Sequence, residues 1–154
     1  MKHKRRPLSL WLLVVLLITL ALGALGGGAA LILKPDGSLM QWPETLLKST
    51  PFSNYLIPGL TLFTLLGVYP LIVMYSLLKR PGWGWPNALN PFKSIHWAWA
   101  ASLAAGIIPL IWIAVQVWML GYVHPLQPSI FILGALISLV TLLPGNRRYF
   151  ALST

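Results

Sequence analysis

The chain of 154 residues contains no cysteine, and only Asp36 and Glu44 are acidic. Without cysteine there is no disulfide, no thiolate nucleophile and no cysteine-ligated iron–sulfur cluster. Charged residues make up 8% of the chain and hydrophobic residues 57%, whereas an ordinary soluble domain carries about 25% charged residues. Too few polar side chains remain to cover a soluble fold. The composition therefore predicts a membrane protein.

Charge is absent altogether from four long apolar segments, at residues 8–33, 55–78, 97–121 and 128–143. About 20 apolar residues in a helix cross a hydrocarbon core of roughly 30 Å. The first three segments reach that length, and the fourth reaches it with part of the preceding turn. We therefore predict an all-α integral membrane four-helix bundle, with residues 1–154 in a single transmembrane domain. Carriers and pumps commonly hold an ionisable group at mid-membrane, so its absence disfavours a secondary transporter.

The basic residues, which give a formal net charge of +9, alternate with these segments. Lysine and arginine accumulate in short cytoplasmic segments, and only Lys34 and Lys48 fall outside this pattern. We expect both termini in the cytoplasm, and contact with anionic lipids rather than nucleic acid. Nine basic residues define the three cytoplasmic segments: Lys2, Lys4, Arg5, Arg6, Lys79, Arg80, Lys93, Arg147 and Arg148.

The first apolar segment also resembles a secretory signal, because residues 8–22 are followed by the small residues of 23–26. Its apolar character nevertheless continues to residue 33, and three more apolar segments follow. We expect an uncleaved first helix.

The segment between the first two spans, residues 34–54, combines turn formers with a short helical pattern. Pro35, Asp36 and Gly37 favour a turn. Pro43 suits the first position of a helix, and residues 44–48 allow one or two turns before Pro51 stops them. We predict a short interfacial helix that covers the outer end of the bundle.

Two features within the spans are typical of helix packing. Gly23 and Gly27 form a G-x-x-x-G pair, whose missing side chains let another helix approach closely. We interpret this as contact with another helix of the same chain, and the alternatives are a partner subunit's helix or a flat lipid or pigment. Gln116 is the only amide in the third span. We expect it to face a partner, because an unpaired amide in hydrocarbon costs a few kcal/mol.

The second span contains Pro58 and Pro70, each of which removes a backbone donor and favours a bend. Two bends at different depths predict an uneven groove along this helix. The simpler interpretation is that neighbouring helices fill this groove. The alternative is that the groove binds a ligand.

The segment between the second and third spans alternates turn formers with tryptophans. Indole rings favour the headgroup level of a membrane, so an interfacial loop is the simpler interpretation. The alternative is a site where basic side chains beside these rings hold a lipid phosphate. The residues concerned are Arg80, Trp83, Trp85, Lys93, Trp97 and Trp99.

No residue pattern names a reaction. His96 and His124 flank the third span from opposite ends, so they cannot be the two axial ligands of one haem. Either alone suffices for a haem or chlorophyll metal, but a plain interfacial role is favoured, and we expect no cofactor and no metal. Asp36, Glu44 and His124 share the outer face without a fixed geometry. The hydroxyls within the spans are expected to bond to their own helix backbone: Thr19, Thr61, Thr64, Ser102 and Ser138.

Two stretches carry a resemblance. Ser49–Phe63, STPFSNYLIPGLTLF, and Trp112–Pro128, WIAVQVWMLGYVHPLQP, resemble a group of small bacterial four-span proteins described as hypothetical membrane proteins. The resemblance covers the second to fourth spans. It implies a bacterial inner-membrane protein and supplies no activity.

Together these patterns favour a multi-pass membrane protein without catalytic activity, acting as an accessory, structural or assembly subunit of a membrane complex. Its expected partners are membrane lipids and either other membrane-protein subunits or further copies of itself. The alternative is a lipid- or small-hydrophobe-binding protein or carrier. A membrane enzyme ranks third, because the candidate groups lie only on loops.

Overall fold

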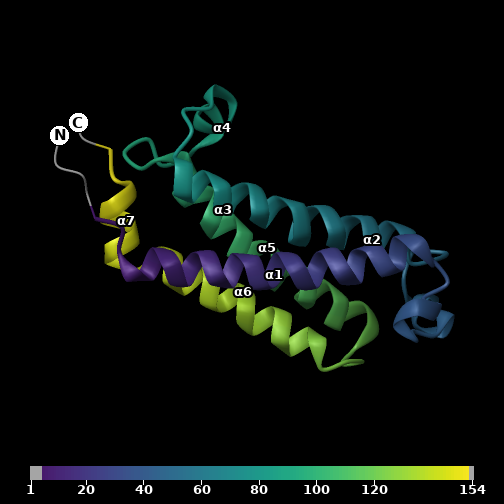
Figure 1. Cartoon of the computed structure of the whole chain (residues 1–154). Coiled ribbons are helices and arrows are strands. Elements are labelled where there is room, and N and C mark those ends of the chain that lie inside the picture. Colours follow the sequence, from purple (N-terminus) through teal and green to yellow (C-terminus); the bar gives the residue numbers. More distant parts are fainter. Residues whose placement is uncertain (1–4, 153–154) are drawn as a thin grey trace.

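A computed structural model describes residues 5–152 of the chain (Figure 1). Four long helical segments lie side by side, and each packs against two others, so that they close into a four-membered bundle. These segments are α1 (Leu8–Leu33), the continuous run α2 (Leu56–Thr61), η3 (Leu62–Val68) and α3 (Tyr69–Lys79), α5 (Trp97–Leu120), and α6 (Leu126–Leu142).

Four short helices decorate the ends of the bundle: η1 (Ser38–Met40), η2 (Glu44–Ser49), α4 (Gly84–Leu89) and α7 (Pro144–Phe150). Within residues 5–152 there is no β-strand, and extended backbone pairs only in an isolated antiparallel bridge between Ile95 and Ala151. The predicted short helix of the first loop corresponds to η2, which adopts the tighter 3₁₀ form.

The all-helical prediction is confirmed, and three helical segments are long and apolar enough to cross a membrane. A fourth candidate exists when α6 and α7 are counted as one span, although the two are bent by 60° relative to each other. Leu143 separates them in an extended conformation, and Pro144 then opens α7. The predicted last segment, 128–143, is therefore a helix of 17 residues that starts two residues earlier than expected.

The second span is straight enough to count as one segment despite its two prolines. Its middle, η3, is a π-helix, and the amide of Tyr69 donates to the carbonyl of Thr64, five residues earlier. Pro70 lacks an N–H and cannot donate the usual helical hydrogen bond, and the turn just before it is widened into the π form. The predicted bend at Pro70 thus takes the form of a π segment.

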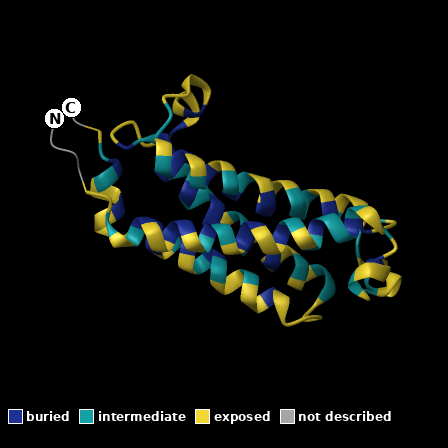
Figure 2. Cartoon of the chain, viewed as in Figure 1, coloured by how far each residue is buried: buried dark blue, intermediate teal, exposed yellow. Residues whose placement is uncertain are grey.

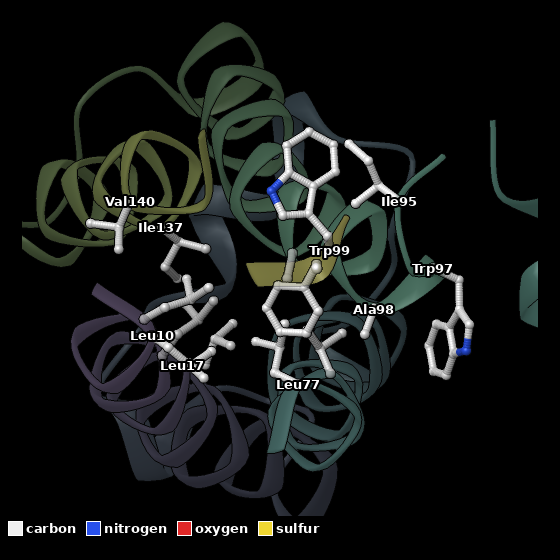
Figure 3. Close-up of a cluster of buried hydrophobic side chains, with 14 of the residues drawn as sticks. Leu10, Leu17, Leu77, Ile95, Trp97, Ala98, Trp99, Ile137 and Val140 are labelled. Carbon is white, nitrogen blue, oxygen red and sulfur yellow. The ribbon is translucent and has the colours of Figure 1, made fainter. Parts of the chain in front are cut away.

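The core is built from side chains at helical spacing. Leu10, Leu13 and Leu17 of α1 are fully buried, and the outward-facing side chains of the same helix are apolar as well. Figure 3 shows Leu10 and Leu17 with Ile137 of α6 in one cluster. Figure 2 shows exposed stripes along every long helix. A chain that is apolar inside and outside suits a hydrocarbon surround.

Two pairs of glycines mark close approaches between helices: Gly28 with Gly59, and Gly106 with Gly134. A Cβ atom added to Gly28 of α1 would lie 2.7 Å from the amide nitrogen of Phe63 and 2.9 Å from the carbonyl oxygen of Gly59. A Cβ atom on Gly106 of α5 would lie 2.7 Å from the amide nitrogen of Ser138 in α6. Real Cβ atoms do not approach backbone this closely, so the backbones themselves are in contact.

Candidate functional site

The two ends of the bundle differ in charge. The terminal end, where α1 and α5 begin, α3 ends and α7 lies, carries seven basic residues and no acid among residues 5–152. The loop end, with η1, η2 and the turn at 121–125, carries both acids together with Lys34 and Lys48. The basic residues of the terminal end are Arg5, Arg6, Lys79, Arg80, Lys93, Arg147 and Arg148.

Arg6 and Lys93 bind carbonyls near helix ends. The Arg6 guanidinium donates to Leu78 near the end of α3, at 3.1 Å. The Lys93 ammonium donates to the carbonyls of Asn87 and Ala88 near the end of α4, at 3.3 and 3.2 Å. The last carbonyls of a helix lack intrahelical donors and carry partial negative charge. Part of the basic cluster therefore stabilises helix ends.

Arg80 is the most constrained of these residues. It follows α3 with a φ of 51°, in the left-handed region that favours glycine. Its guanidinium donates to the carbonyl of Tyr149 at 2.8 Å and lies over the rings of Tyr149 and Phe150, 4.7 and 5.0 Å from their centroids. The hydrogen bond and the two cation–π contacts offset the backbone strain.

The segment after α6 folds back over the terminal end. The amide of His96 donates to the carbonyl of Phe150, and that of Leu152 donates to Ser94, both at 2.9 Å. Phe150 is fully buried. The last described residues are thereby paired with the chain just before α5.

Asn146 of α7 joins three helices. It is fully buried, its side-chain oxygen accepts from the Ser9 hydroxyl at 2.9 Å, and its amide donates to the carbonyl of Val140 at 2.7 Å. The oxygen and the NH₂ group of the Asn146 side chain are thus both hydrogen-bonded, as a buried amide requires. Asn146 fixes α7 against α1 and α6.

His96 and His124 perform the same local task at opposite ends. The Nδ1 atom of each accepts from the backbone amide two residues later, Ala98 or Leu126, at 3.2 Å. Each histidine thus caps the first turn of α5 or α6. Burial, followed by the charge of nearby Arg80, lowers the pKa of His96. No group of three or more His, Asp or Glu residues within residues 5–152 is arranged to hold a metal ion.

The tryptophans proposed to contact lipid divide into two pairs. Trp97 and Trp99 are buried, and their indole N–H groups donate to the carbonyls of Pro81 at 3.0 Å and Thr141 at 2.9 Å. Figure 3 shows Trp99 inside the apolar cluster. Both rings are therefore enclosed by other parts of the chain. Trp83 and Trp85 are exposed, and Trp83 stacks between Tyr75 and Trp97, with centroid distances of 6.3 and 5.5 Å.

The candidate packing residues are only partly in contact within the chain. Gly23 is exposed, and a Cβ there would meet nothing within 4 Å. A Cβ on Gly27 would lie 3.4 Å from a methyl group of Leu62, so the close crossing lies one residue further along, at Gly28. Gln116 is half-buried, and its side chain makes no hydrogen bond to residues 5–152. Contacts of Gly23 and Gln116 with a partner remain proposals.

The loop end is held by local contacts. The Asp36 carboxylate accepts from the amide and the hydroxyl of Ser38, at 3.0 and 2.7 Å, and these bonds lower the pKa of Asp36. The Tyr55 hydroxyl donates to the carbonyl of Pro43 at 2.9 Å. Among the described residues no hydrogen bond or ion pair joins Asp36, Glu44 and His124. Within residues 5–152 these three side chains therefore do not form one bonded group.

An open apolar hollow of about 330 Å³ lies between α5 and α6 near the loop end. A second hollow of about 360 Å³, lined in part by polar side chains such as Glu44 and Lys48, lies beside η2. Neither is lined by Pro58 or Pro70, because α1 packs against that part of the second span. The first hollow is lined by Ile113, Ala114, Val117, Tyr122, Gln127, Pro128, Phe131 and Ile132.

The prediction for the intramembrane hydroxyls is confirmed. Thr19, Thr61, Thr64 and Ser138 each donate to the carbonyl four residues earlier, and Ser102 donates to the carbonyl three residues earlier. These hydroxyls thus find their acceptors within their own helices.

Comparisons with protein-family models, with curated proteins and with solved structures find no match to this chain. The resemblance of Ser49–Phe63 and Trp112–Pro128 to small bacterial four-span proteins remains a prediction.

Proposed function

We propose that this chain is a multi-pass protein of the bacterial inner membrane, with both termini in the cytoplasm, that acts without catalysis as an accessory, structural or assembly subunit of a membrane complex. The observation that carries the proposal is the distribution of polar groups. Among residues 5–152, every buried side-chain polar atom has a hydrogen-bond partner within the chain. The long helices meanwhile expose large apolar side chains outward. We therefore expect this protein to contact other molecules through its apolar outer surface.

The asymmetry of charge supports the orientation. Seven cations gather at the terminal end, and the loop end, with two cations and two acids, is neutral. Cytoplasmic segments of membrane proteins carry the excess of Lys and Arg. A cysteine accessibility experiment tests this orientation, because the native chain has no cysteine. In intact cells an impermeant thiol reagent should label Ser38→Cys at the loop end and leave Asn87→Cys unlabelled; the reverse pattern would overturn the orientation.

Native mass spectrometry of the protein, extracted gently from its own membrane, tests the subunit role. Defined other chains at fixed stoichiometry are expected. Gly23→Leu should reduce their recovery, because Gly23 is open on the outer face of α1, while Gly23→Ala serves as the smaller matched change. A protein that is always recovered without partner chains would contradict the subunit role.

The alternative is a lipid- or small-hydrophobe-binding protein. The apolar hollow between α5 and α6 favours it, since such hollows bury apolar ligands. A reproducible small-molecule adduct in the same mass spectra, lost in Ala114→Trp, would establish this function in place of the first.

A further inference from the structure

Residues 81–93, which lie between α3 and α5, carry several exposed apolar side chains, of which Trp85 and Leu89 are the most exposed. We call this segment the α4 loop. Trp85 is 71% exposed and Leu89 is 77% exposed. They are four residues apart in α4 and therefore share one face of that helix. Figure 1 shows α4 set off to the side of the bundle, near the end of α3.

The α4 loop is held firmly at both ends. At its start, the carbonyl of Pro81 accepts from the indole of Trp97, and Trp83 stacks on that same ring. At its end, the buried amide of Asn90 donates to the carbonyls of Phe92 and Ile95, at 3.0 and 2.8 Å. A tryptophan and a leucine are thus presented on a fixed support rather than on a free chain.

The positive charge around the α4 loop indicates which kind of partner covers the exposed face of α4. Lys79 lies just before the α4 loop and Lys93 is its last residue, and no acid lies among the described residues of the terminal end. A second copy docking through the same end would bring seven cations against seven, which is repulsive. An anionic surface complements the loop. Indole rings favour the headgroup level, and cations beside a membrane are attracted to anionic lipids.

We propose that the α4 loop is a membrane-surface anchor, which inserts Trp85 and Leu89 into the leaflet beside the terminal end and places Lys79 and Lys93 among anionic phospholipid headgroups. The inference rests on the proposed membrane insertion of the bundle. In this proposal the exposed face of α4 contacts lipid, and the α4 loop contacts the membrane beside the helical bundle.

The absence of native cysteine gives a clean test. The full-length Leu89→Cys protein is labelled with an environment-sensitive fluorophore and reconstituted into vesicles of phosphatidylcholine, or of equal parts phosphatidylcholine and phosphatidylglycerol. Asn87→Cys is the matched control, because Asn87 is exposed on the other face of α4. Leu136→Cys, exposed on α6, reports on the span itself.

Lipids carrying a nitroxide near the headgroup should quench the fluorescence of the probe at position 89. The probe at position 87 should instead be quenched by iodide added to the aqueous phase. Quenching at position 89 should be roughly twofold stronger with phosphatidylglycerol present. Equal quenching at positions 87 and 89, or no effect of the anionic lipid, would overturn the anchor. So would oxidative cross-linking of unlabelled Leu89→Cys into a dimer, which would assign the face to a second copy. If a nitroxide deep in the acyl chains fails to quench position 136, the proposed membrane insertion is what fails.

Discussion

The terminal end and the loop end are closed by different kinds of contact. At the terminal end the hydrogen bonds join residues far apart in the chain: Ser9 to Asn146 and Arg80 to Tyr149. At the loop end they lie within one connecting segment, as between Asp36 and Ser38 or between Tyr55 and Pro43. The hydrogen bonds of the loop end therefore close within that segment, whereas those of the terminal end require an assembled bundle.

The largest effect is expected from the backbone contact in the loop-end half of α1. Gly28→Leu places side-chain atoms where the Phe63 amide and the Gly59 carbonyl lie, so we expect a loss of about 3 kcal/mol in the free energy of unfolding. Denaturation in detergent micelles, followed by circular dichroism, measures it. Gly23→Leu, which meets open space within the chain, is the control and should unfold like the native protein. Equal stability of the two variants would refute the crossing at Gly28.

The next effect concerns the terminal end. Asn146→Ala removes the bond to Ser9 and leaves the Val140 carbonyl without that donor, so we expect a loss of about 2 kcal/mol. Ser129→Ala is matched to it at the loop end, because Ser129 bonds only to the nearby Pro125 carbonyl. If the two substitutions cost the same, the distinction between long-range and local closure does not hold.

Arg80→Gln sharpens the same comparison. The shorter neutral side chain loses the Tyr149 carbonyl and both ring contacts, which should cost about 1 kcal/mol and loosen the pairing of residues 150–152 with 94–96. Hydrogen exchange of the His96 and Leu152 amides should accelerate. Lys34→Gln, an exposed change at the loop end, should leave both amides as protected as in the native protein.

The smallest effect is a dependence on pH. Because burial and Arg80 lower the pKa of His96, the unfolded chain takes up this proton before the folded chain does. Stability should be fully present above the ordinary pKa of 6.5 and fall as the pH drops below it toward the folded value. Melting temperatures across this range measure the slope. His96→Asn should flatten it, whereas His124→Asn should retain it, since His96 and Arg80 are unchanged there.

The long helices were predictable because each rests on an uninterrupted apolar run. The bounds of α1 agree with the predicted 8–33, and α5 ends one residue before the predicted 121. The hydroxyl contacts were predictable as well, because a serine or threonine in a helix finds its acceptor within four residues.

Contacts across the fold were not predictable in the same way. Spacing drew attention to Gly23 and Gly27, but the rotation of α1 in the bundle brings Gly28 against Gly59, and nothing local in the sequence fixes that rotation. Trp97 and Trp99 match the pattern of interfacial tryptophans, yet Trp97 packs on Pro81 and Trp83, and Trp99 is held by Thr141 of α6. The pairing of residues 94–96 with 150–152 has no sequence periodicity that marks it.

The hydrogen bond between Arg80 and Tyr149 joins two parts of the chain that are made at different times during synthesis. The acceptor of the Arg80 guanidinium is the carbonyl of Tyr149, which leaves the ribosome only after all four long helices have been made. Until then Arg80, already held near the end of α3, has no contact with α7. A nascent chain that stops after α6 would hold all four long helices of the described chain and would still leave Arg80 without its acceptor in α7.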